Sequence, residues 1–364
     1  MALVPFLPVW PQSATGAGEG HGHWSLRVQA VLASPPRGSA RSPGEETRMR
    51  ITRRGLALLA APSLASAQAP AWPNRPVRLI NPFAPGGPQD VPARFFVEAL
   101  TPKLGQPLVY DSRAGAGGAV GLQHVAQATD GHSFVITSNA VATLPAIRRN
   151  LGFDPFTDLQ PVTLVMQSPY TIVVRANGPA SFADFLGQAR AAPNRLTFGS
   201  SGVGASTHLT MALLMQKAGI ALTHVPYRGA QLAMTAVLAG DIDAFIGDLS
   251  VPLEHIRAGT ARCLAVTTTA RAPLLPEVPA AAELVPGFAS TLWYGLFAAK
   301  ATPPEAVRRM LAELQALRGG ELVQRLSSVG AELLLSGPAP LAERLRAEVP
   351  QWRAVVAAAG IEPE

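Results

Sequence analysis

The chain has 364 residues, of which 48% are hydrophobic, and carries 30 Lys and Arg against 24 Asp and Glu. Residues 1–67 hold seven Arg and three Glu, so residues 68–364 keep 23 basic and 21 acidic residues and are close to neutral. No extended run of Lys or Arg follows Gln68. This argues against a nucleic-acid partner, because such surfaces gather basic residues on one face. The single cysteine, Cys263, excludes an intrachain disulfide, and its apolar neighbours predict a buried structural thiol.

The segment that begins at Met49 has the three parts of an export signal. Three arginines (50, 53 and 54) precede a short apolar stretch, Leu56–Leu64, and Ala65-Ser66-Ala67 supplies the small residues that a signal peptidase accepts. The apolar stretch is about half the ~18 residues that a membrane span needs. We therefore expect a signal peptide at 49–67, cleaved near Ala67, and a periplasmic mature protein. Both the twin-arginine and the Sec export routes fit these residues.

Residues 1–48 are rich in Gly, Pro and Ser and show no hydrophobic periodicity. Because a signal peptide works from the N-terminus of a chain, we expect Met49 to be the true start and 1–48 to be a misassigned upstream extension. A disordered leader is the alternative interpretation of this segment.

From residue 68 onward, strands, turns that contain Gly or Pro, and helices alternate. This alternation predicts mainly parallel sheets with helices on both faces, which is the α/β class. The first series contains strands at 77–80, 108–110 and 133–137, and helices at 90–103 and after 115–118. The second series contains strands at 171–174, 196–199, 222–225, 242–246 and 264–267, and helices at 181–191, 206–218 and 230–239.

The last part of the chain follows a strand at 293–297 and is almost wholly helical. Apolar residues recur at three- and four-residue spacing in 303–318, 320–329 and 338–359. We expect the chain to begin domain 1 with 68–168, to form domain 2 from 169–292, and to complete domain 1 with 293–364. Two crossings between the same two domains make a hinge.

Two turns rich in Gly or Ser follow predicted strands and open predicted helices: Pro82–Asp90 and Gly199–Thr207. Ligands of open α/β sheets bind at the carboxyl ends of the strands. Exposed backbone N–H groups and the positive ends of the following helices can hold a carboxylate there without an arginine. Each turn taken alone also fits a plain tight turn.

Motifs of common enzyme classes are missing. The sequence contains no G-x-x-x-x-G-K-[ST] phosphate loop, and Gly115–Gly121 departs from the G-x-G-x-x-G pattern. Ser201 lacks the final glycine of a G-x-S-x-G elbow, and the histidines after residue 67 include no H-x-x-x-H or H-E-x-x-H pair. We expect no catalytic residue, no metal and no cofactor. A serine-based hydrolase stays as the enzyme alternative.

Several longer motifs follow one another between Trp72 and Ile361. They are Trp72–Ile80, Pro82–Asp90, Arg113–Gly118, Phe153–Pro155, Gly199–Gly204, His224–Gly229, Glu254–Gly259 and Trp293–Phe297. In these motifs the chain resembles the substrate-binding proteins of tripartite tricarboxylate transporters, the Bug (Bordetella uptake gene) family. The resemblance implies a type II periplasmic-binding-protein fold, in which two α/β domains are joined by a hinge and enclose a ligand cleft.

The same resemblance implies two sets of ligand-binding residues. In domain 1, the residues that would bind a ligand carboxylate, together with ordered water, are Phe83, Gly86, Gly87, Pro88, Gln89 and Asp90. Ser138 and Asn139 are added because of their position after the third strand. In domain 2 they are Ser200, Ser201, Gly204, Ala205, Ser206, Thr207 and His208, joined by position by Tyr227, Arg228 and Asp248. Ser138 and Asn139 also fit a turn cap, Tyr227 and Arg228 a helix start, and Asp248 an acid in a loop.

Two residues depart from the family pattern, and a third, Asp248, stands where Asn or Asp is usual. Val203 and Ala205 stand where polar side chains are common, so the domain 2 grip would depend more on backbone groups and favour a less polar ligand. A charged Asp248 that faced the ligand would disfavour a second carboxylate nearby and favour an amine or a hydroxyl.

The resemblance therefore implies an exported, monomeric receptor that captures a small organic carboxylate for the membrane components of a tripartite transporter. A binding protein that signals to a membrane sensor kinase is the alternative, because both would present the same closed surface. The identity of the ligand stays open, since backbone N–H groups recognise a carboxylate and not the rest of its molecule.

Overall fold

The computed structural model describes residues 72–86 and 89–363, all of which belong to one unit of the chain, Ala67–Glu364. The predicted leader, the export signal with its cleavage site, and the predicted site residues Gly87 and Pro88 lie outside the described residues. None of the helices in the described part is long and apolar enough to cross a bilayer.

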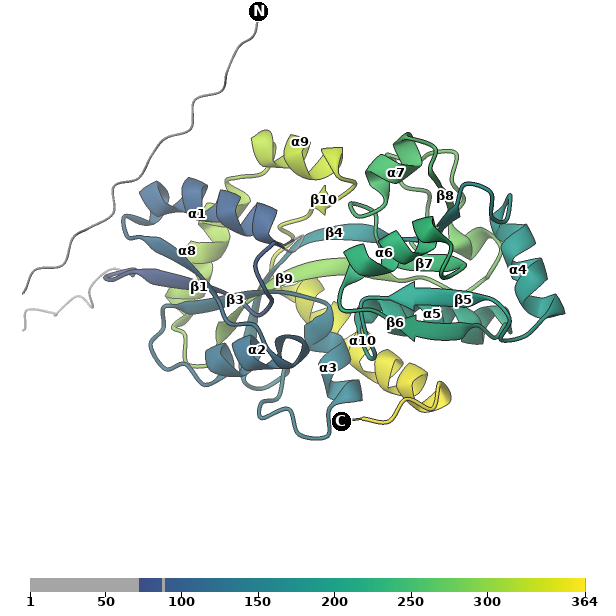
Figure 1. The fold of residues 1–364 in the computed structure, drawn as a ribbon. Coiled ribbons are helices and arrows are strands. Elements are labelled where there is room, and N and C mark those ends of the chain that lie inside the picture. Colours follow the sequence, from purple (N-terminus) through teal and green to yellow (C-terminus); the bar gives the residue numbers. More distant parts are fainter. Residues whose placement is uncertain (1–71, 87–88, 364) are drawn as a thin grey trace, which may run out of the picture. The chain divides into compact units, whose positions relative to one another are not determined.

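The described elements alternate along the chain. The strands are β1 (Val77–Asn81), β2 (Leu108–Ser112), β3 (Ser133–Ser138), β4 (Leu159–Arg175), β5 (Thr197–Ser200), β6 (Thr223–Pro226), β7 (Ala244–Asp248), β8 (Ala261–Val266), β9 (Thr291–Ala299) and β10 (Glu332–Leu333). The helices are α1 (Asp90–Leu104), α2 (Ala119–Ala126), α3 (Ala140–Ile147), α4 (Phe182–Ala191), α5 (Ser206–Ala218), α6 (Ala230–Ala239), α7 (Leu253–Arg257), α8 (Pro304–Gln315), α9 (Glu321–Ser328) and α10 (Pro338–Ala358). The strands pair in the order β2-β1-β3-β9-β4-β7-β5-β6, and β8 and β10 also pair with β4 (Figure 1).

Strand β4 joins two groups of strands because its two halves have different partners. Its first half pairs with β9 and β10, which together with β1, β2 and β3 we call the first strand group. Its second half pairs with β7 and β8, which together with β5 and β6 form the second strand group. The change falls between Pro169, opposite Thr291 of β9, and Tyr170, opposite Asp248 of β7. The two groups therefore meet along β4 and β9, which run side by side in Figure 1.

Strand direction differs between the outer strands and the crossing strands. β1 pairs in parallel with β2 and β3, and β5 pairs in parallel with β6 and β7. β4 and β9 pair antiparallel with their described neighbours. The prediction of mainly parallel sheets is thus correct for the outer strands and wrong for the crossing strands. Strand–helix–strand units give parallel neighbours, whereas β4 extends from the first group into the second and β9 follows the return of the chain to the first group.

Most elements lie within three residues of the positions that the sequence predicts. The exceptions include the first half of β4 and helix α3. Pro161 and Pro169 interrupt the first half of β4, and proline within a run of residues argues against a strand. Pro145 has the same effect on the pattern of α3.

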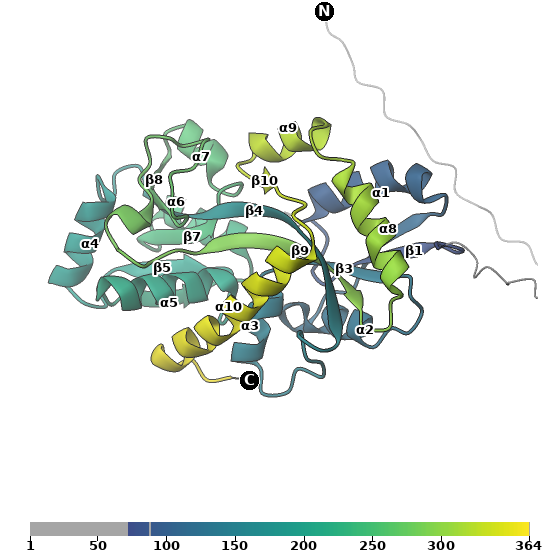
Figure 2. The ribbon, with the colours of Figure 1, turned by 180° about the vertical axis from the view of Figure 1, so that it is seen from behind.

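Helix α10 lies against both strand groups, and Figure 2 shows it crossing in front of the crossing strands. It contacts α3 on one side, α5 on the other, and β4 between them. Trp352 of α10 and Trp293 of β9 are almost fully buried and belong to one hydrophobic cluster that reaches α1, α5 and β3. Burial of α10 therefore stabilises both groups together. The thiol of Cys263 is buried, as the sequence predicts.

We expect the core around the buried strand β3 to contribute strongly to stability. Truncating Phe134, which is 0% exposed, to alanine removes a core ring and leaves a cavity, and should cost about 3–5 kcal/mol of unfolding free energy. The matched change Phe156→Ala removes a ring that is 46% exposed and should stay within about 0.5 kcal/mol of the parent. Urea unfolding followed by circular dichroism measures both, and equal losses would contradict the assigned core.

Candidate ligand-binding site

The predicted site residues that the structure describes lie where strands end and helices begin. They occupy the turns that follow β1, β3, β5, β6 and β7. β1 and β3 run parallel, as do β5, β6 and β7, so within each strand group the carboxyl ends of these strands lie at the same edge. Each strand group thus gathers its own set of predicted residues at one edge.

Asn81, the last residue of β1, organises the first turn. It is fully buried, and its side-chain oxygen accepts hydrogen bonds from the Phe83 N–H at 3.0 Å and from Gln89 Nε2 at 3.3 Å. Its Nδ2 donates to Asp90 Oδ1 at 3.1 Å. Sequence reasoning missed Asn81. An asparagine that ends a buried strand and begins a turn is nevertheless a detectable signal, because its side chain readily forms a hydrogen bond with the backbone two residues later.

The carboxylate of Asp90 is engaged within the same turn. It accepts hydrogen bonds from Asn81 Nδ2, from the Gly86 N–H and from the Tyr110 hydroxyl. Burial, reinforced by the hydrogen bond to Asp90, raises the pKa of Tyr110 well above its ordinary value. Asp90 therefore shapes the turn. Ala84, Pro85 and Gly86 are exposed, and Phe83 is partly exposed.

The turn after β5 is held by its own side chains and lies against helix α3. Thr207 Oγ1 accepts the Ser201 N–H at 3.0 Å and lies 2.8 Å from Ser201 Oγ. Gly204 has a φ of 69°, and a Cβ there would lie 3.0 Å from Ile147 Cδ1 of α3. Both the backbone conformation and this close approach therefore favour glycine at 204.

Two stacked imidazoles support this second turn. The rings of His208 and His224 have centroids 3.8 Å apart and planes 11° apart, and Phe198 stacks on His224 at 4.8 Å. His208 Nδ1 accepts the Gly204 N–H at 3.1 Å, so the proton of the neutral ring is on Nε2. Burial lowers the pKa of each histidine to about 4. Both rings are therefore neutral at pH 7 and act as hydrogen-bonding partners of the turn.

Ser200 is fully buried, and its hydroxyl is used inside the turn. Its Oγ donates to the Gly202 carbonyl at 3.0 Å, accepts the Gly202 N–H at 3.2 Å, and lies 2.7 Å from His224 Nε2. A hydroxyl has one proton and two lone pairs, so His224 Nε2 must donate to it. The hydroxyl of Ser200 then has no hydrogen-bonding capacity left.

Asp248 ends β7 next to the crossing strand. Its carboxyl is 8% exposed, and Oδ1 accepts hydrogen bonds from the N–H and the hydroxyl of Ser250. Burial raises the pKa of this carboxyl. The Ser168 hydroxyl lies beside it without reaching hydrogen-bonding geometry. Asp248 is thus a buried acid without an ion pair among the described residues.

The remaining predicted residues have simpler surroundings. Ser138 Oγ accepts the Ala140 N–H at 3.3 Å and so caps the start of α3. The Tyr227 N–H donates to the Ser200 carbonyl at 3.1 Å, which ties the turn after β6 to that after β5. Arg228 is exposed beside it. Ala205 and Ser206 are partly exposed at the start of α5.

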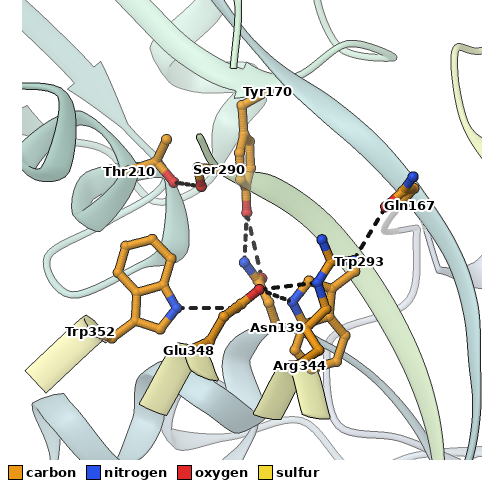
Figure 3. Close-up of polar contacts among 9 residues, drawn as sticks. All are labelled: Asn139, Gln167, Tyr170, Thr210, Ser290, Trp293, Arg344, Glu348 and Trp352. Carbon is orange, nitrogen blue, oxygen red and sulfur yellow. Dashed lines mark hydrogen bonds and ion pairs between the residues drawn. The ribbon is translucent and has the colours of Figure 1, made fainter. Parts of the chain in front are cut away.

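Tyr170 joins the site from β4, and sequence reasoning missed it. Its hydroxyl lies 3.3 Å from Nδ2 of Asn139, the residue before α3, and Figure 3 shows the ring pointing at that side chain. The side chain is 1% exposed, and burial raises its pKa. Because Tyr170 is the residue at which β4 changes partners, this hydrogen bond links the crossing strand to the first set of site residues. No motif surrounds Tyr170, so only the fold reveals it.

The histidine pair predicts a loss of stability in acid. In the unfolded chain these rings take up protons near pH 6.5, whereas in the folded protein they resist protonation until about pH 4. The unfolded state therefore binds more protons between these values, and stability falls as the pH drops from about 6.5 to 4.

Melting temperatures at pH 7 and pH 5 measure this effect. We expect His224→Gln to reduce the difference between the two, because one buried titrating ring is removed. His255→Gln, at a partly exposed position of α7, is the matched control and should leave the difference unchanged. An equal drop in the parent and in His224→Gln would contradict the assignment.

Comparison with known proteins identifies the family. Residues 93–361 match the model of the tripartite tricarboxylate transporter family receptor. A Pseudomonas protein encoded in the tcbD–tcbE intergenic region is 36% identical over 308 residues, which cover 83% of this chain and 92% of the relative. Protein BugT of Bordetella pertussis is 31% identical over 312 residues, which cover 84% of this chain and 96% of BugT.

Three solved structures are similar in fold over most of the chain. The periplasmic binding protein BugD has a TM-score of 0.70 at 32% identity, covering 80% of this chain and 100% of BugD. An R. palustris protein with adipate has a TM-score of 0.71 at 33% identity, covering 80% and 100%. MatC from Rhodopseudomonas palustris with bound malate has a TM-score of 0.68 at 29% identity, covering 78% and 99%.

These matches confirm the family and the fold class that the sequence motifs predict. The chain belongs to the tripartite tricarboxylate transporter receptors, the Bug family of solute-binding proteins, and has their two-domain α/β periplasmic-binding-protein fold.

Proposed function

We propose that this protein is a periplasmic receptor that captures a small organic carboxylate and presents it to the membrane components of a tripartite transporter. The observation that carries the proposal is the pair of turns after β1 and β5, each of which ends a strand and opens a helix. Two similar proteins of known structure hold the dicarboxylates adipate and malate. Cleavage of the export signal near Ala67 and a monomeric state are part of the proposal.

The first turn of α5 supplies the contacts that we assign to the ligand carboxylate. The first intrahelical hydrogen bond of α5 runs from the Leu209 N–H to the Ala205 carbonyl. The N–H groups of 206–208 therefore have no acceptor within the helix, and the positive end of the helix favours an anion there. The Ser206 hydroxyl is at the same place. Ser200, Thr207 and His208 are bonded within the turn and would position it.

The first turn would close on the ligand from the other side. Phe83 and Gly86 are the predicted contacts that remain accessible in this turn, and Asn81 and Asp90 hold the turn from within. Gln89 is buried and donates to Asn81, so we assign it the same supporting role. Tyr227 and Arg228 would border the cleft.

We also propose the domain boundaries 68–168 with 293–364, and 169–292. The change of β4 partners between Pro169 and Tyr170 supports the first boundary, and the start of β9 at Thr291 lies next to the second. Helix α10 falls in domain 1 by this division but also contacts α5 of domain 2.

We propose that the protein catalyses no reaction. The pair Ser200–His224 has a nucleophile–base distance of 2.7 Å, which is the geometry that a serine hydrolase would need. However, Ser200 is 0% exposed, its proton is donated to the Gly202 carbonyl, and a pKa of about 4 makes His224 a weak base. These observations favour a structural role for the pair.

Thermal-shift measurements on protein expressed from the full chain test the function. A carboxylate at about 100 times its dissociation constant stabilises a receptor by about 2.7 kcal/mol. At about 2–4 °C per kcal/mol the melting temperature should rise by roughly 5–10 °C. Adipate and malate are the first probes, and their dimethyl esters are the controls. Equal shifts with acids and esters, or none with any small carboxylate, would contradict the proposal.

Two substitutions at Ser206 distinguish the contribution of its hydroxyl from that of its backbone N–H. Ser206→Ala removes the hydroxyl and keeps the N–H, whereas Ser206→Pro removes both at a helix position that tolerates proline. We expect Ser206→Pro to weaken carboxylate binding about tenfold and Ser206→Ala to weaken it less, because hydrogen bonds to charged groups are worth about 1.5–3 kcal/mol. Calorimetric titration measures both. Equal affinities of the proline variant and the parent would exclude the N–H contact.

Asp248 should discriminate between ligands by charge. We propose that its buried carboxyl lies near the ligand and disfavours a second carboxylate there. Asp248→Asn should then bind dicarboxylates more tightly than the parent does, while binding of monocarboxylates stays the same. An unchanged ratio between the two classes would place Asp248 away from the ligand.

A further inference from the structure

A cavity of about 740 Å³ lies beside the crossing strands, next to α10. We call it the rear cavity. It is bounded by Gln167–Pro169 of β4, the loop 268–274, residues 289–291 at the start of β9, the segment 327–332 and the middle of α10. Its walls come from both strand groups. Its volume lies within the ~300–1,000 Å³ range of pockets that bury small molecules.

At β4, the Gln167 side chain that lines the rear cavity and the Tyr170 side chain of the candidate ligand site point to opposite faces of the strand. Side chains one residue apart on a strand point to opposite faces. Tyr170 points to Asn139, whereas the Gln167 side chain, an odd number of residues away, accepts a hydrogen bond from Arg344 Nη1 of α10 at 3.2 Å (Figure 3). A molecule in the rear cavity would therefore not occupy the space of the carboxylate.

The α10 side chains that line one wall of the rear cavity form hydrogen bonds with both β4 and β9. Glu348 of α10 accepts hydrogen bonds from Trp293 Nε1 of β9 at 2.8 Å and from Trp352 Nε1 at 3.2 Å, and its partner Arg344 lies 3.3 Å away (Figure 3). Arg344 in turn bonds Gln167 of β4. A change in the relative twist of β4 and β9 must therefore rearrange this wall.

The charges of the lining favour a cation. Its charged members are Arg271, Arg344, Glu332 and Glu348. Arg344 pairs with Glu348, and Arg271 pairs at 2.8 Å with Glu283, which lies outside the lining. The described hydrogen bond of the Glu332 side chain is with a neutral group, Gln167 Nε2, at 2.8 Å. An ammonium group at Glu332 would balance this charge, and the apolar side chains of the loop 268–274 offer contact to a hydrocarbon body.

We propose that the rear cavity is a second ligand site, which binds a small organic amine and thereby opposes closure of the carboxylate cleft. The coupling follows from the hinge. If the two domains rotate about β4 and β9 so that the cleft closes, their surfaces on the opposite face of these strands move apart. An amine that contacts the loop 268–274 on one side and Glu332 on the other holds these surfaces together. The cleft ligand and the amine then weaken each other.

Direct binding is measured first, without any carboxylate. Phenethylammonium chloride and its neutral analogue 2-phenylethanol are titrated by ligand-observed NMR into protein expressed from the full chain. We expect the amine to bind more tightly than the alcohol. Glu332→Gln should weaken amine binding about threefold to fivefold, as expected for a partly solvated ion pair. Glu343→Gln makes the same change at an exposed position of α10 outside the cavity and should have no effect.

A second variant tests the other wall. Thr269 is exposed on the loop 268–274, so Thr269→Trp should fold normally and obstruct the rear cavity. We expect it to abolish amine binding. Equal binding of amine and alcohol, or amine binding that neither variant weakens, overturns the proposed site.

The coupling is then measured with adipate or malate, whichever binds. Saturating amine should raise the dissociation constant of the carboxylate about fivefold or more, and the carboxylate should raise that of the amine by the same factor. Unchanged constants overturn the regulatory part of the proposal, which rests on the proposed function. If no carboxylate binds at all, the proposed function fails while the amine titration still decides whether the rear cavity is a site.

Discussion

Buried backbone groups need hydrogen-bonding partners, and β4 meets this requirement by pairing with four different strands. The change of partners falls at Pro169, which has no N–H group to donate and therefore fits a point where one ladder ends and another begins. The residues of β4 up to Pro169 pair with β9 and β10, and those from Tyr170 onward pair with β7 and β8. Tyr170 is directed to the candidate ligand site and Gln167 to the rear cavity, so one strand forms part of both.

The two turns of the candidate site share a design in which polar side chains are used to hold the backbone. Asn81 and Asp90 do this in the first turn, and Ser200 with the histidine pair does it in the second. The polar groups that remain for a ligand are then mainly N–H groups in the first turns of helices. A rigid backbone of this kind lowers the entropy lost on binding. His208 must be neutral in this arrangement, because its Nδ1 accepts a hydrogen bond from the Gly204 N–H.

Much of this arrangement could be predicted from local sequence. The turns and the family motifs are encoded by neighbouring residues, and the parallel outer strands follow from the alternation of strands and helices along the chain. The first half of β4 could not be predicted, because its prolines hide it until β9 and β10 supply the missing partners. The roles within the site were also hidden. Ser200 and Asp90 resemble ligand contacts in sequence, and only their bonds to His224 and Tyr110 reveal that they serve the turns. Tyr170 meets Asn139 across 31 residues of chain, a separation that no local pattern records.

The position of α10 has a consequence for the order of folding. This helix is the last element of the described chain, yet it fills a groove that needs α3, β4 and α5 already in place. A chain synthesised from its N-terminus therefore leaves the surfaces of α3, β4 and α5 that contact α10 uncovered until its final helix arrives. Synthesis and folding are thereby separated in time. The core of this fold is therefore completed only when its last helix can pack against α3, β4 and α5.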